Sequence, residues 1–160
     1  GINPVFDRLE NADEKLFNKI LDINTKSPFK LSNLVFKYMK ENKAGSIINI
    51  SSVEGHKPDK GLGVYSISKA AISMLTKSQA KEWGKYGVRS NAICPGLIRT
   101  KLSSVLWQNE EMLEAWLGDL PIRRPGDPDE ISGMALYLAS EASSYTTGET
   151  FNIDGGYMIN

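Results

Sequence analysis

Tyr65 and Lys69 stand four residues apart in the segment Tyr-Ser-Ile-Ser-Lys, thirteen and seventeen positions after Ser52. On a helix, side chains four residues apart share one face and can reach each other. A free tyrosine has a pKa near 10, but an ammonium group at about 4 Å stabilises its phenolate by roughly 4 kcal/mol at an effective dielectric constant near 20. Lowering the pKa to about 7 requires roughly that free energy. The pair can therefore exchange a proton with an alcohol or a carbonyl group.

Ser52 follows a short run with strand character, Ser-Ile-Ile-Asn-Ile-Ser over residues 46–51. A side chain at the carboxyl end of a strand lies where α/β proteins usually bind ligands. Ser52 could there donate a hydrogen bond to a substrate oxygen beside Tyr65. The alternative is a serine that only caps a turn.

Pro28 interrupts a pattern of apolar residues that predicts a helix from about residue 11 to residue 42, with Asn11 and Glu14 as a capping box. Proline has no N–H and crowds the carbonyl four residues earlier, which is that of Asn24. In a continuous helix that carbonyl needs another partner, for example a water molecule that also contacts Lys69. The alternative is a simple kink.

The remaining elements alternate between helix and strand. The sequence predicts a loop over 53–63, a helix over 64–86, a strand over 88–94, an amphipathic stretch over 101–117, a helix over 129–139 and a strand over 151–154. This alternation favours a parallel sheet with crossover helices. Three strands would leave much of such a sheet uncovered, so we expect residues 1–160 to be a single unit: the later strands and helices of a Rossmann-like, doubly wound α/β domain.

Composition excludes several classes of function. The chain has nineteen acidic and nineteen basic residues, which gives no reason to expect nucleic-acid binding. No apolar run is long enough for a membrane span, and the single cysteine, Cys94, fits a reducing compartment. With one histidine and one cysteine, a protein metal site is not expected. We therefore expect a cytoplasmic protein with no metal, nucleic-acid or membrane partner.

Several motifs together resemble the short-chain dehydrogenase/reductase family. They are Asn24, Asn49-Ile-Ser-Ser52, Tyr65-x-x-Ser-Lys69, Asn91-Ala-Ile-Cys-Pro-Gly96, Arg124-Pro-Gly-Asp-Pro-Asp-Glu130 and Thr147-Gly-Glu-Thr-Phe-Asn-Ile-Asp-Gly-Gly156. The resemblance extends over essentially the whole chain. It implies an NAD- or NADP-dependent oxidoreductase that interconverts a secondary alcohol and a carbonyl compound, and it implies a homodimer or homotetramer.

The resemblance also assigns roles to residues. Tyr65 would be the general acid/base, Ser52 would orient the substrate oxygen, Lys69 would lower the pKa of Tyr65 and bind the nicotinamide ribose, and Asn24 would hold a relay water. The cofactor-contacting residues implied are Gly1, Tyr65, Lys69, Pro95, Gly96, Ile98 and Thr100. The family's glycine-rich phosphate turn has no counterpart here, and Gly1 resembles the end of the Asn-Asn-Ala-Gly motif that follows the fourth strand. We therefore expect further sequence upstream, including the residue that separates NAD from NADP.

On the substrate side, the resemblance assigns residues of about 100–120 to a mobile lid, with Trp107 as the contact. Ser52, Glu54 and Tyr65 are the other predicted substrate contacts, and a polar group near the pocket favours a hydroxylated substrate such as a sugar or polyol. His56 is expected to be a loop residue. Two other functions remain open: a relative of the sugar-nucleotide epimerases and dehydratases, or a cofactor-free truncated module for oligomerisation or binding.

Overall fold

Three parallel strands form the centre of the computed structural model, which describes residues 1–118 and 120–159. Strands β1 (Gly45–Ile50), β2 (Val88–Pro95) and β3 (Thr150–Ile153) lie in the order β1-β2-β3. The register aligns Ile50 with Ile93 and Pro95 with Ile153. The predicted α/β class with parallel strands is confirmed.

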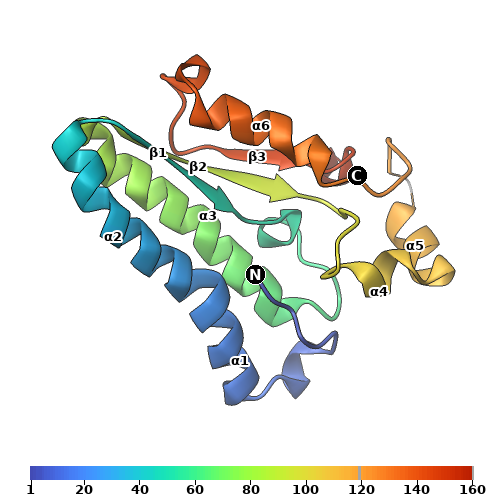
Figure 1. Cartoon of the computed structure of the whole chain (residues 1–160). Helices are drawn as coiled ribbons and strands as arrows, with labels where there is room; N and C mark the ends of the chain where they lie inside the picture. The colour runs from blue at the N-terminus through green and yellow to red at the C-terminus, as the bar shows by residue number, and fades with distance from the viewer. Residues whose placement is uncertain (119, 160) are drawn as a thin grey trace.

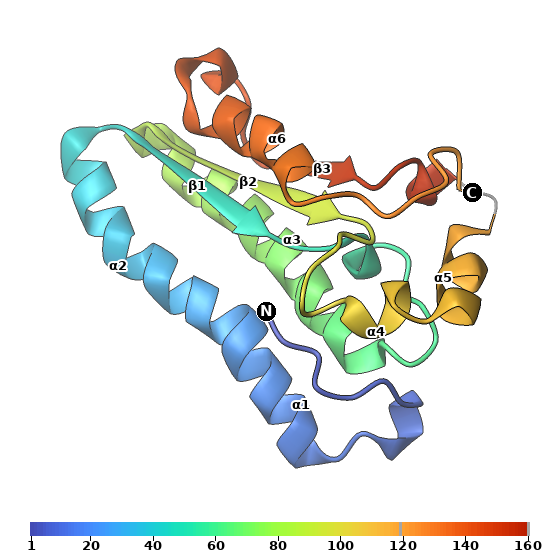
Figure 2. The ribbon, with the colours of Figure 1, turned by 45° about the vertical axis from the view of Figure 1, so that its right-hand side comes forward.

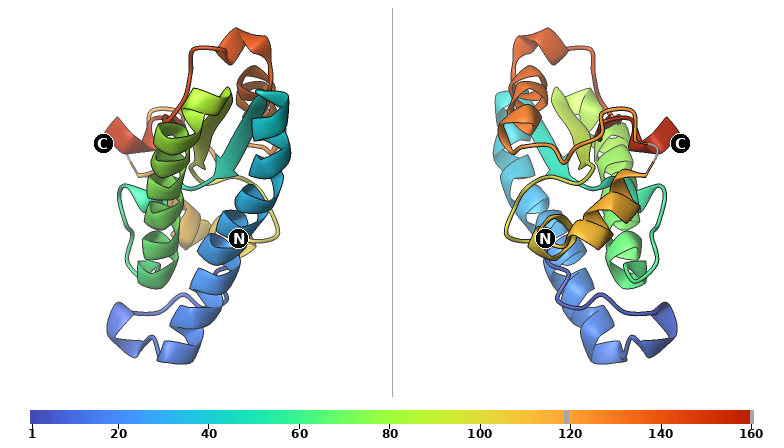
Figure 3. Two further views of the ribbon diagram at one scale, coloured as in Figure 1. Left: turned by 90° about the vertical axis from the view of Figure 1, so that its left-hand side faces the viewer. Right: turned by 90° about the vertical axis from the view of Figure 1, so that its right-hand side faces the viewer.

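The helices cover both faces of this sheet. Helices α2 (Ser27–Asn42) and α3 (Gly63–Trp83) pack side by side on one face, and α6 (Asp129–Ala139) packs on the other (Figures 1 and 3). Helix α1 (Glu14–Leu21) continues the direction of α2, whereas α4 (Ser104–Trp107) and α5 (Glu110–Leu117) lie beyond the carboxyl ends of the strands (Figure 2). Within the described ranges, no helix is both long and apolar enough to span a membrane.

The carboxyl ends of the three strands meet at one edge of the sheet. Past β1, the amide of Ser51 donates to the carbonyl of Ile93 at 2.8 Å, and past β2 the amide of Gly96 donates to the carbonyl of Ile153 at 3.0 Å. Parallel pairing thus continues beyond the regular strands. This continued pairing places Ser52 and the segment after Gly96 beside each other, on the side of the sheet where α4 and α5 lie (Figure 2).

A buried polar network fixes α3 against the sheet. The side-chain amide of Asn49 donates to Thr76 at 2.9 Å and to Gln79 at 3.0 Å, and Ser90 donates to Gln79 at 2.8 Å. All four side chains are buried. Because buried polar groups are costly unless they are hydrogen-bonded, this network favours one position of α3 along β1 and β2, and it thereby sets where Tyr65 and Lys69 lie.

The long helix predicted over residues 11–42 is wrong in two respects. Asp13, not Asn11, is the N-cap, because its carboxylate accepts a hydrogen bond from the amide of Leu16 at 2.7 Å. The helix is also divided: a π-helical turn, Asp22–Lys26, separates α1 from α2. Pro28 is the second residue of α2, a position near a helix start that tolerates proline.

The amphipathic stretch predicted over 101–117 forms two helices. The first, α4, ends at Trp107, and Asn109 caps α5 by accepting a hydrogen bond from the amide of Met112 at 2.9 Å. Helix α5 is attached to the body of the protein through Trp116, whose ring stacks on Tyr157 with centroids 5.0 Å apart. The buried side chains of Val53, Leu117, Leu120 and Tyr157 form a small apolar core there.

Candidate functional site

Ser52 and Tyr65 line the same open cleft at the carboxyl edge of the sheet. Ser52 directly follows the end of β1 and is buried, whereas Tyr65 lies in the first turn of α3. Burial raises the pKa of Tyr65 above its ordinary value, a hydrogen bond with Ser52 opposes this, and the charge of Glu54 adds to it. The phenol is therefore protonated at neutral pH.

Lys69 lies one helical turn after Tyr65, and it is buried. Its ammonium donates to the carbonyl of Ile50 at 2.9 Å and stands 5.6 Å from the centroid of the Tyr65 ring. Burial lowers the pKa of Lys69 to about 8. A lowering of the Tyr65 pKa by Lys69 is not seen in this structure, because desolvation of the phenolate raises that pKa and the ammonium is turned toward the carbonyl of Ile50. The role of Lys69 stays a prediction.

Asn24 lies in the π-helical turn, and its side chain is 3% exposed. Its Oδ1 accepts from the amide of Ile2 at 2.7 Å, and its Nδ2 donates to the carbonyl of Ile2 at 2.9 Å and to the hydroxyl of Ser68 at 3.0 Å. Asn24 thus joins the first residues of the chain to α3. Pro28 in the sequence pointed to the main-chain carbonyl of Asn24 and not to its side chain. That Asn24 holds a relay water stays a prediction.

Gly1 is packed against two of these residues. A Cβ atom on Gly1 would lie 3.0 Å from Oδ1 of Asn24 and 3.2 Å from Nζ of Lys69. Both separations are shorter than most van der Waals contacts of a real Cβ. The structure therefore brings Gly1, Asn24 and Lys69 together, as it brings together Ser52 and Tyr65.

The cleft has mostly apolar walls and a few polar groups. The apolar side chains are Phe6, Val53, Leu62, Leu97, Leu102, Leu106 and Trp116, and the polar residues are Asn3, Ser52, Glu54, Tyr65 and Ser103. In the described ranges, Nδ2 of Asn3 is buried without a hydrogen-bond partner. The sequence reasoning missed Asn3 and Phe6, because the irregular first residues carry no periodic pattern that would place them.

The segment after β2 approaches the cleft from the other side. Gly96 lines the cleft, and a Cβ there would lie 2.9 Å from the Cα of Asp154, so this crossing requires a glycine. Pro95 ends β2. Ile98 forms an isolated parallel bridge with Gly126, and the hydroxyl of Thr100 is 3.0 Å from that of Ser103.

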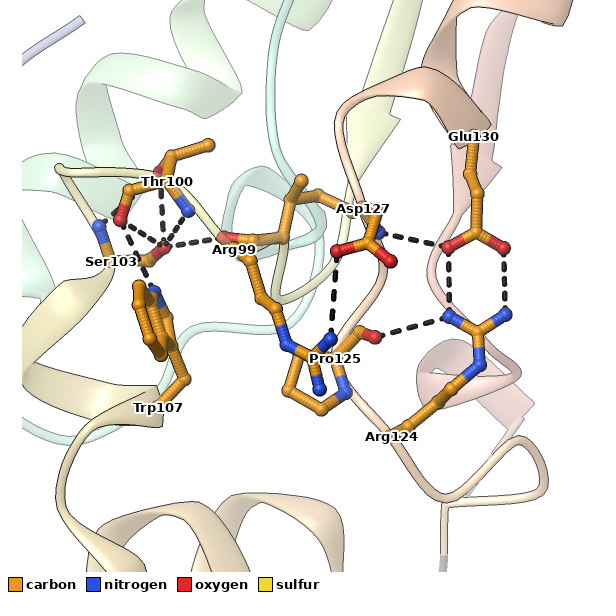
Figure 4. Close-up of polar contacts among 9 residues, drawn as sticks. Arg99, Thr100, Ser103, Trp107, Arg124, Pro125, Asp127 and Glu130 are labelled. Carbon is orange, nitrogen blue, oxygen red and sulfur yellow. Dashed lines mark hydrogen bonds and ion pairs between the residues drawn. The ribbon is translucent and has the colours of Figure 1, made fainter.

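Trp107 stabilises this segment and does not line the cleft. Its indole Nε1 donates to the carbonyl of Thr100 at 3.2 Å, as Figure 4 shows. Trp116 from α5 lines the cleft instead. The substrate contact predicted for Trp107 is therefore not what this structure shows, since the hydrogen bond to Thr100 holds the indole against its own turn.

A pair of charged residues holds the neighbouring loop. The guanidinium of Arg124 donates to both carboxylate oxygens of Glu130, at 2.8 and 2.7 Å, and the amide of Asp127 donates to the same carboxylate at 2.8 Å (Figure 4). These hydrogen bonds, with that from Arg124 as the largest cause, hold the pKa of Glu130 at about 2. The bidentate geometry fixes the loop against Ile98, which with Gly126 lines a second cavity of about 480 Å³.

His56 lies outside the cleft, in the loop that follows Ser52. Its Nε2 is 3.4 Å from the sulfur of Cys94, and burial raises the pKa of that thiol. His56 thus contacts the end of β2, and it is not among the residues that line the cleft with Tyr65. Its predicted place in a loop agrees with the structure.

Glu54 is a buried acid beside the two candidate catalytic hydroxyls. Only 6% of its surface is exposed, and it lines the cleft with Ser52 and Tyr65. Burial raises the pKa of Glu54 to about 7, the Asp59 carboxylate adds to the shift, and hydrogen bonds from the Asp59 amide and the Ser66 hydroxyl oppose it. A carboxyl kept in an apolar wall at the cost of desolvation is typical of a functional group.

This pKa makes the protein less stable at higher pH. Unfolding returns the Glu54 pKa from about 7 to 4.5, so the folded state binds more protons in that interval and stability falls as pH rises through about 7. The shift corresponds to about 3 kcal/mol, which partial screening by water reduces to about 2 kcal/mol. We therefore expect Glu54→Gln to gain about 2 kcal/mol relative to the unsubstituted protein between pH 4.5 and pH 8.

Urea denaturation at several pH values measures this difference. The same substitution at the exposed Glu141 is the control for loss of a surface charge. A stability difference between Glu54→Gln and the unsubstituted protein that does not change with pH would show that Glu54 is not a titrating buried acid.

The comparisons with known proteins agree with this arrangement. A family model described as enoyl-(acyl carrier protein) reductase matches residues 1–158. Dehydrogenase/reductase SDR family member 4 of Oryctolagus cuniculus is 39% identical over 156 residues, which are 98% of this chain and 60% of that protein. The chain belongs to the short-chain dehydrogenase/reductase family. The resemblance expected from the sequence motifs is confirmed.

Solved structures of this family match the whole fold. A gluconate 5-dehydrogenase from Burkholderia cenocepacia, in complex with NADP and tartrate, superposes with a TM-score of 0.97 at 29% identity and covers 100% of this chain and 62% of that one. A 4-hydroxyisoleucine dehydrogenase mutant, complexed with NADH and succinate, superposes with a TM-score of 0.95 at 33% identity and covers 100% and 66%. The chain therefore has a Rossmann-type α/β fold of the short-chain dehydrogenase/reductase family, and it spans about three fifths of the length of these relatives.

Proposed function

We propose that this short-chain dehydrogenase/reductase interconverts a secondary alcohol and a carbonyl compound with NAD or NADP. The observation that carries the proposal is the convergence of Ser52, Tyr65 and Lys69 beside one cleft at the carboxyl edge of the sheet. Two hydroxyl groups and a buried ammonium suit proton transfer to and from a substrate oxygen. The relatives crystallised with NADP or NADH support the cofactor.

The residues present fit the nicotinamide and ribose end of such a dinucleotide. The ammonium of Lys69 has three donor hydrogens, and one serves the carbonyl of Ile50, which leaves donors for the hydroxyls of a ribose. Gly1 and Gly96 pack so closely on Asn24 and Asp154, respectively, that a side chain would not fit at either position, and both are proposed to contact the nicotinamide end. Pro95, Ile98 and Thr100 are the other proposed contacts of the cofactor. When bound, the nicotinamide supplies the hydride or accepts it.

The protein groups would divide the proton chemistry among themselves. In reduction, the protonated phenol of Tyr65 gives its proton to the carbonyl oxygen as that oxygen gains negative charge, and the hydroxyl of Ser52 donates a hydrogen bond to the same oxygen. The burial that raises the Tyr65 pKa keeps the phenol in the form needed for this direction. In oxidation, the same oxygen gives its proton to the phenolate. Asn24 would hold the segment that begins at Gly1 in place beside Lys69. It would also bind a water molecule that relays protons to and from Lys69.

Hydride transfer can be tested directly with isotope label. We expect the protein expressed from its complete reading frame to oxidise secondary alcohols that carry deuterium on the carbinol carbon, and to place that deuterium on the nicotinamide ring. Mass spectrometry of the reduced cofactor measures the transfer. Turnover that leaves the label in solvent would contradict the proposal and favour another reaction class.

Oligomeric state and location belong to the same proposal. We propose a homo-oligomer, which is supported by apolar side chains on the outer face of α2, since Leu31, Leu34 and Tyr38 are all more than 60% exposed. Contiguous exposed apolar surface of this kind usually marks an interface. We also propose a cytoplasmic location, which the buried free thiol of Cys94 supports.

A further inference from the structure

Trp116 stands between the cleft and the second cavity. Ser52 and Tyr65 line the cleft and not the second cavity, whereas Ile122 lines the second cavity and not the cleft. Among the residues that the structure describes, Leu97 and Trp116 line both. The two cavities are therefore neighbours, and the indole of Trp116 forms the wall between them together with Leu97.

The second cavity is suited to an apolar group. Aliphatic side chains form much of its wall, namely those of Leu97, Ile98, Ile122 and Ile153. The charged side chains in its lining already have partners. Arg124 is paired with Glu130, at 2.8 and 2.7 Å, and the carboxylate of Asp154 accepts hydrogen bonds from the amides of Gly156 and Met158, both at 3.0 Å. A hydrocarbon chain could therefore be buried there without separating a charge from its partner.

Tyr157 holds the ring of Trp116 in this wall. The two rings are stacked, with centroids 5.0 Å apart and planes 4° apart. Tyr157 is itself buried, and its hydroxyl donates to the carboxylate of Asp59 at 2.8 Å. The ammonium of Lys57 lies 4.6 Å from the centroid of the Tyr157 ring and donates to the carbonyl of Tyr157 at 3.4 Å. Because Tyr157 is held through its hydroxyl, its ring and its main chain, the indole stacked on it has a firm support.

The proton of the Tyr157 hydroxyl is secure in this arrangement. Burial raises the pKa of Tyr157, and the hydrogen bond to Asp59 and the charges of Asp59 and Glu54 raise it further. The phenol therefore keeps the proton that it donates to Asp59. The support of Trp116 does not depend on pH through the phenol in the neutral range.

We propose that Trp116 is a specificity-determining residue that limits the length of the substrate: its ring closes the second cavity and restricts the enzyme to alcohols and carbonyl compounds with a short apolar group. The inference rests on the proposed oxidoreductase function and narrows its substrate class. A longer alkyl chain that starts at Tyr65 and follows the cleft to Trp116 meets the indole and cannot continue into the apolar space behind it. Tyr157 is a positioning residue, because it lines neither cavity and acts through Trp116.

A homologous series of alcohols tests this limit. The probes run from butan-2-ol to dodecan-2-ol, one carbon at a time. Their affinity is measured by calorimetry with the protein from its complete reading frame and NADH or NADPH, and KM and kcat for oxidation are measured in parallel with NAD or NADP. In the unsubstituted protein, affinity should rise about fourfold for each methylene that the cleft buries, and it should stop rising once the chain reaches Trp116.

In Trp116→Ala the rise should continue over about two to three further carbons, so that the longest alcohols bind about 10- to 100-fold more tightly than they bind to the unsubstituted protein. This gain should appear mainly in KM. Met112→Ala is the matched control on the same helix, since its side chain is 37% exposed and lines neither cavity. Circular dichroism and the urea midpoint check that both variants are folded.

Ile122→Trp separates use of the second cavity from use of the space that the indole itself leaves. Ile122 is 56% exposed, so a larger ring can be placed there. By itself this substitution should change the affinity for no alcohol, because the cavity behind Trp116 is closed. Combined with Trp116→Ala, it should remove most of the gain for the longest alcohols, a coupling that a double-mutant cycle measures.

Tyr157 provides variants in which Trp116 is retained. Tyr157→Leu removes the stacked ring and should relax the length limit, whereas Tyr157→Phe keeps a stacked ring and should keep the limit. Because Tyr157 lines neither cavity, a merely structural role would lower the urea midpoint without changing the preference for chain length. These two variants also decide the question if Trp116→Ala does not fold.

The results distinguish this inference from the function on which it rests. The same dependence on chain length in Trp116→Ala as in the unsubstituted protein, a gain that Ile122→Trp leaves intact, or equal behaviour of Tyr157→Leu and Tyr157→Phe would overturn the role of Trp116. Oxidation of the whole series without a length limit would contradict that role alone. Length-limited binding without oxidation of any alcohol would contradict the proposed function and leave the role of Trp116 standing.

Discussion

Replacing Tyr65 by phenylalanine should lower kcat by about 10² to 10⁴, the range that general acid/base catalysis contributes. The substitution removes the phenol that lines the cleft beside Ser52 and that would exchange the proton with the reacting oxygen. Lys69 cannot replace it, since its ammonium is bonded to the carbonyl of Ile50. Steady-state kinetics of the protein from its complete reading frame, with deuterated secondary alcohols, measures the loss.

The fold should survive this change, because the phenylalanine ring keeps the packing of Tyr65 at the start of α3. Circular dichroism and the urea midpoint check this point. Tyr145→Phe removes a hydroxyl from an exposed ring far along the chain and serves as the matched control, with unchanged kcat. Turnover above about a tenth of the original in Tyr65→Phe would exclude Tyr65 as the general acid/base.

Gly87→Ala should reduce the free energy of unfolding by about 3 kcal/mol, the upper part of the range for backbone strain at one residue. Gly87 immediately precedes β2 and has φ +77°, a conformation that disfavours any Cβ atom. A Cβ there would lie 2.2 Å from the carbonyl oxygen of Lys43, in the connection between α2 and β1. Neither backbone can move without disturbing the pairing of Gly45 with Val88.

Gly84→Ala provides the control three residues earlier. Gly84 has a helical φ of −54°, and nothing lies within 4 Å of its added Cβ. We expect this protein to be as stable as the original or more stable by up to about 1 kcal/mol, because alanine restricts the unfolded chain. Urea unfolding compares the two variants. Equal stability of both would contradict the close approach of Gly87 to Lys43.

Spacing along the chain was enough to find Ser52, Tyr65 and Lys69, because strand ends and helix periodicity place such residues in known directions. The alternation of helix and strand predicted the α/β class correctly, because each element shows its own periodicity in the sequence. Asn24 was singled out through Pro28, yet its observed contacts are made by its side chain with Ile2 and Ser68. Contacts between segments so distant along the chain leave no local pattern.

Burial explains two differences between the structure and the sequence-based expectations. The sequence suggested that Lys69 would lower the pKa of Tyr65, but desolvation of the phenol, which depends on tertiary packing around α3, raises that pKa. Trp107 and Trp116 are equivalent in an amphipathic pattern. Only the break at Asn109 and the stacking on Tyr157 place Trp116, and not Trp107, in the cleft.

The π-helical turn between α1 and α2 holds one residue more than a regular α-helix would, and this extra residue aligns the buried sides of the two helices. Ile20 and Ser32 are both buried, although residues twelve apart on an uninterrupted α-helix would point about 120° away from each other. The N–H of Ser27 reaches the carbonyl of Asp22, five residues earlier, and so absorbs one residue and reduces that angle to about 20°. Deleting a single residue from this turn would therefore leave Ile20 and Ser32 eleven apart on a regular α-helix, again about 20° from each other, whereas inserting one more residue would rotate α1 relative to α2 by about 100°.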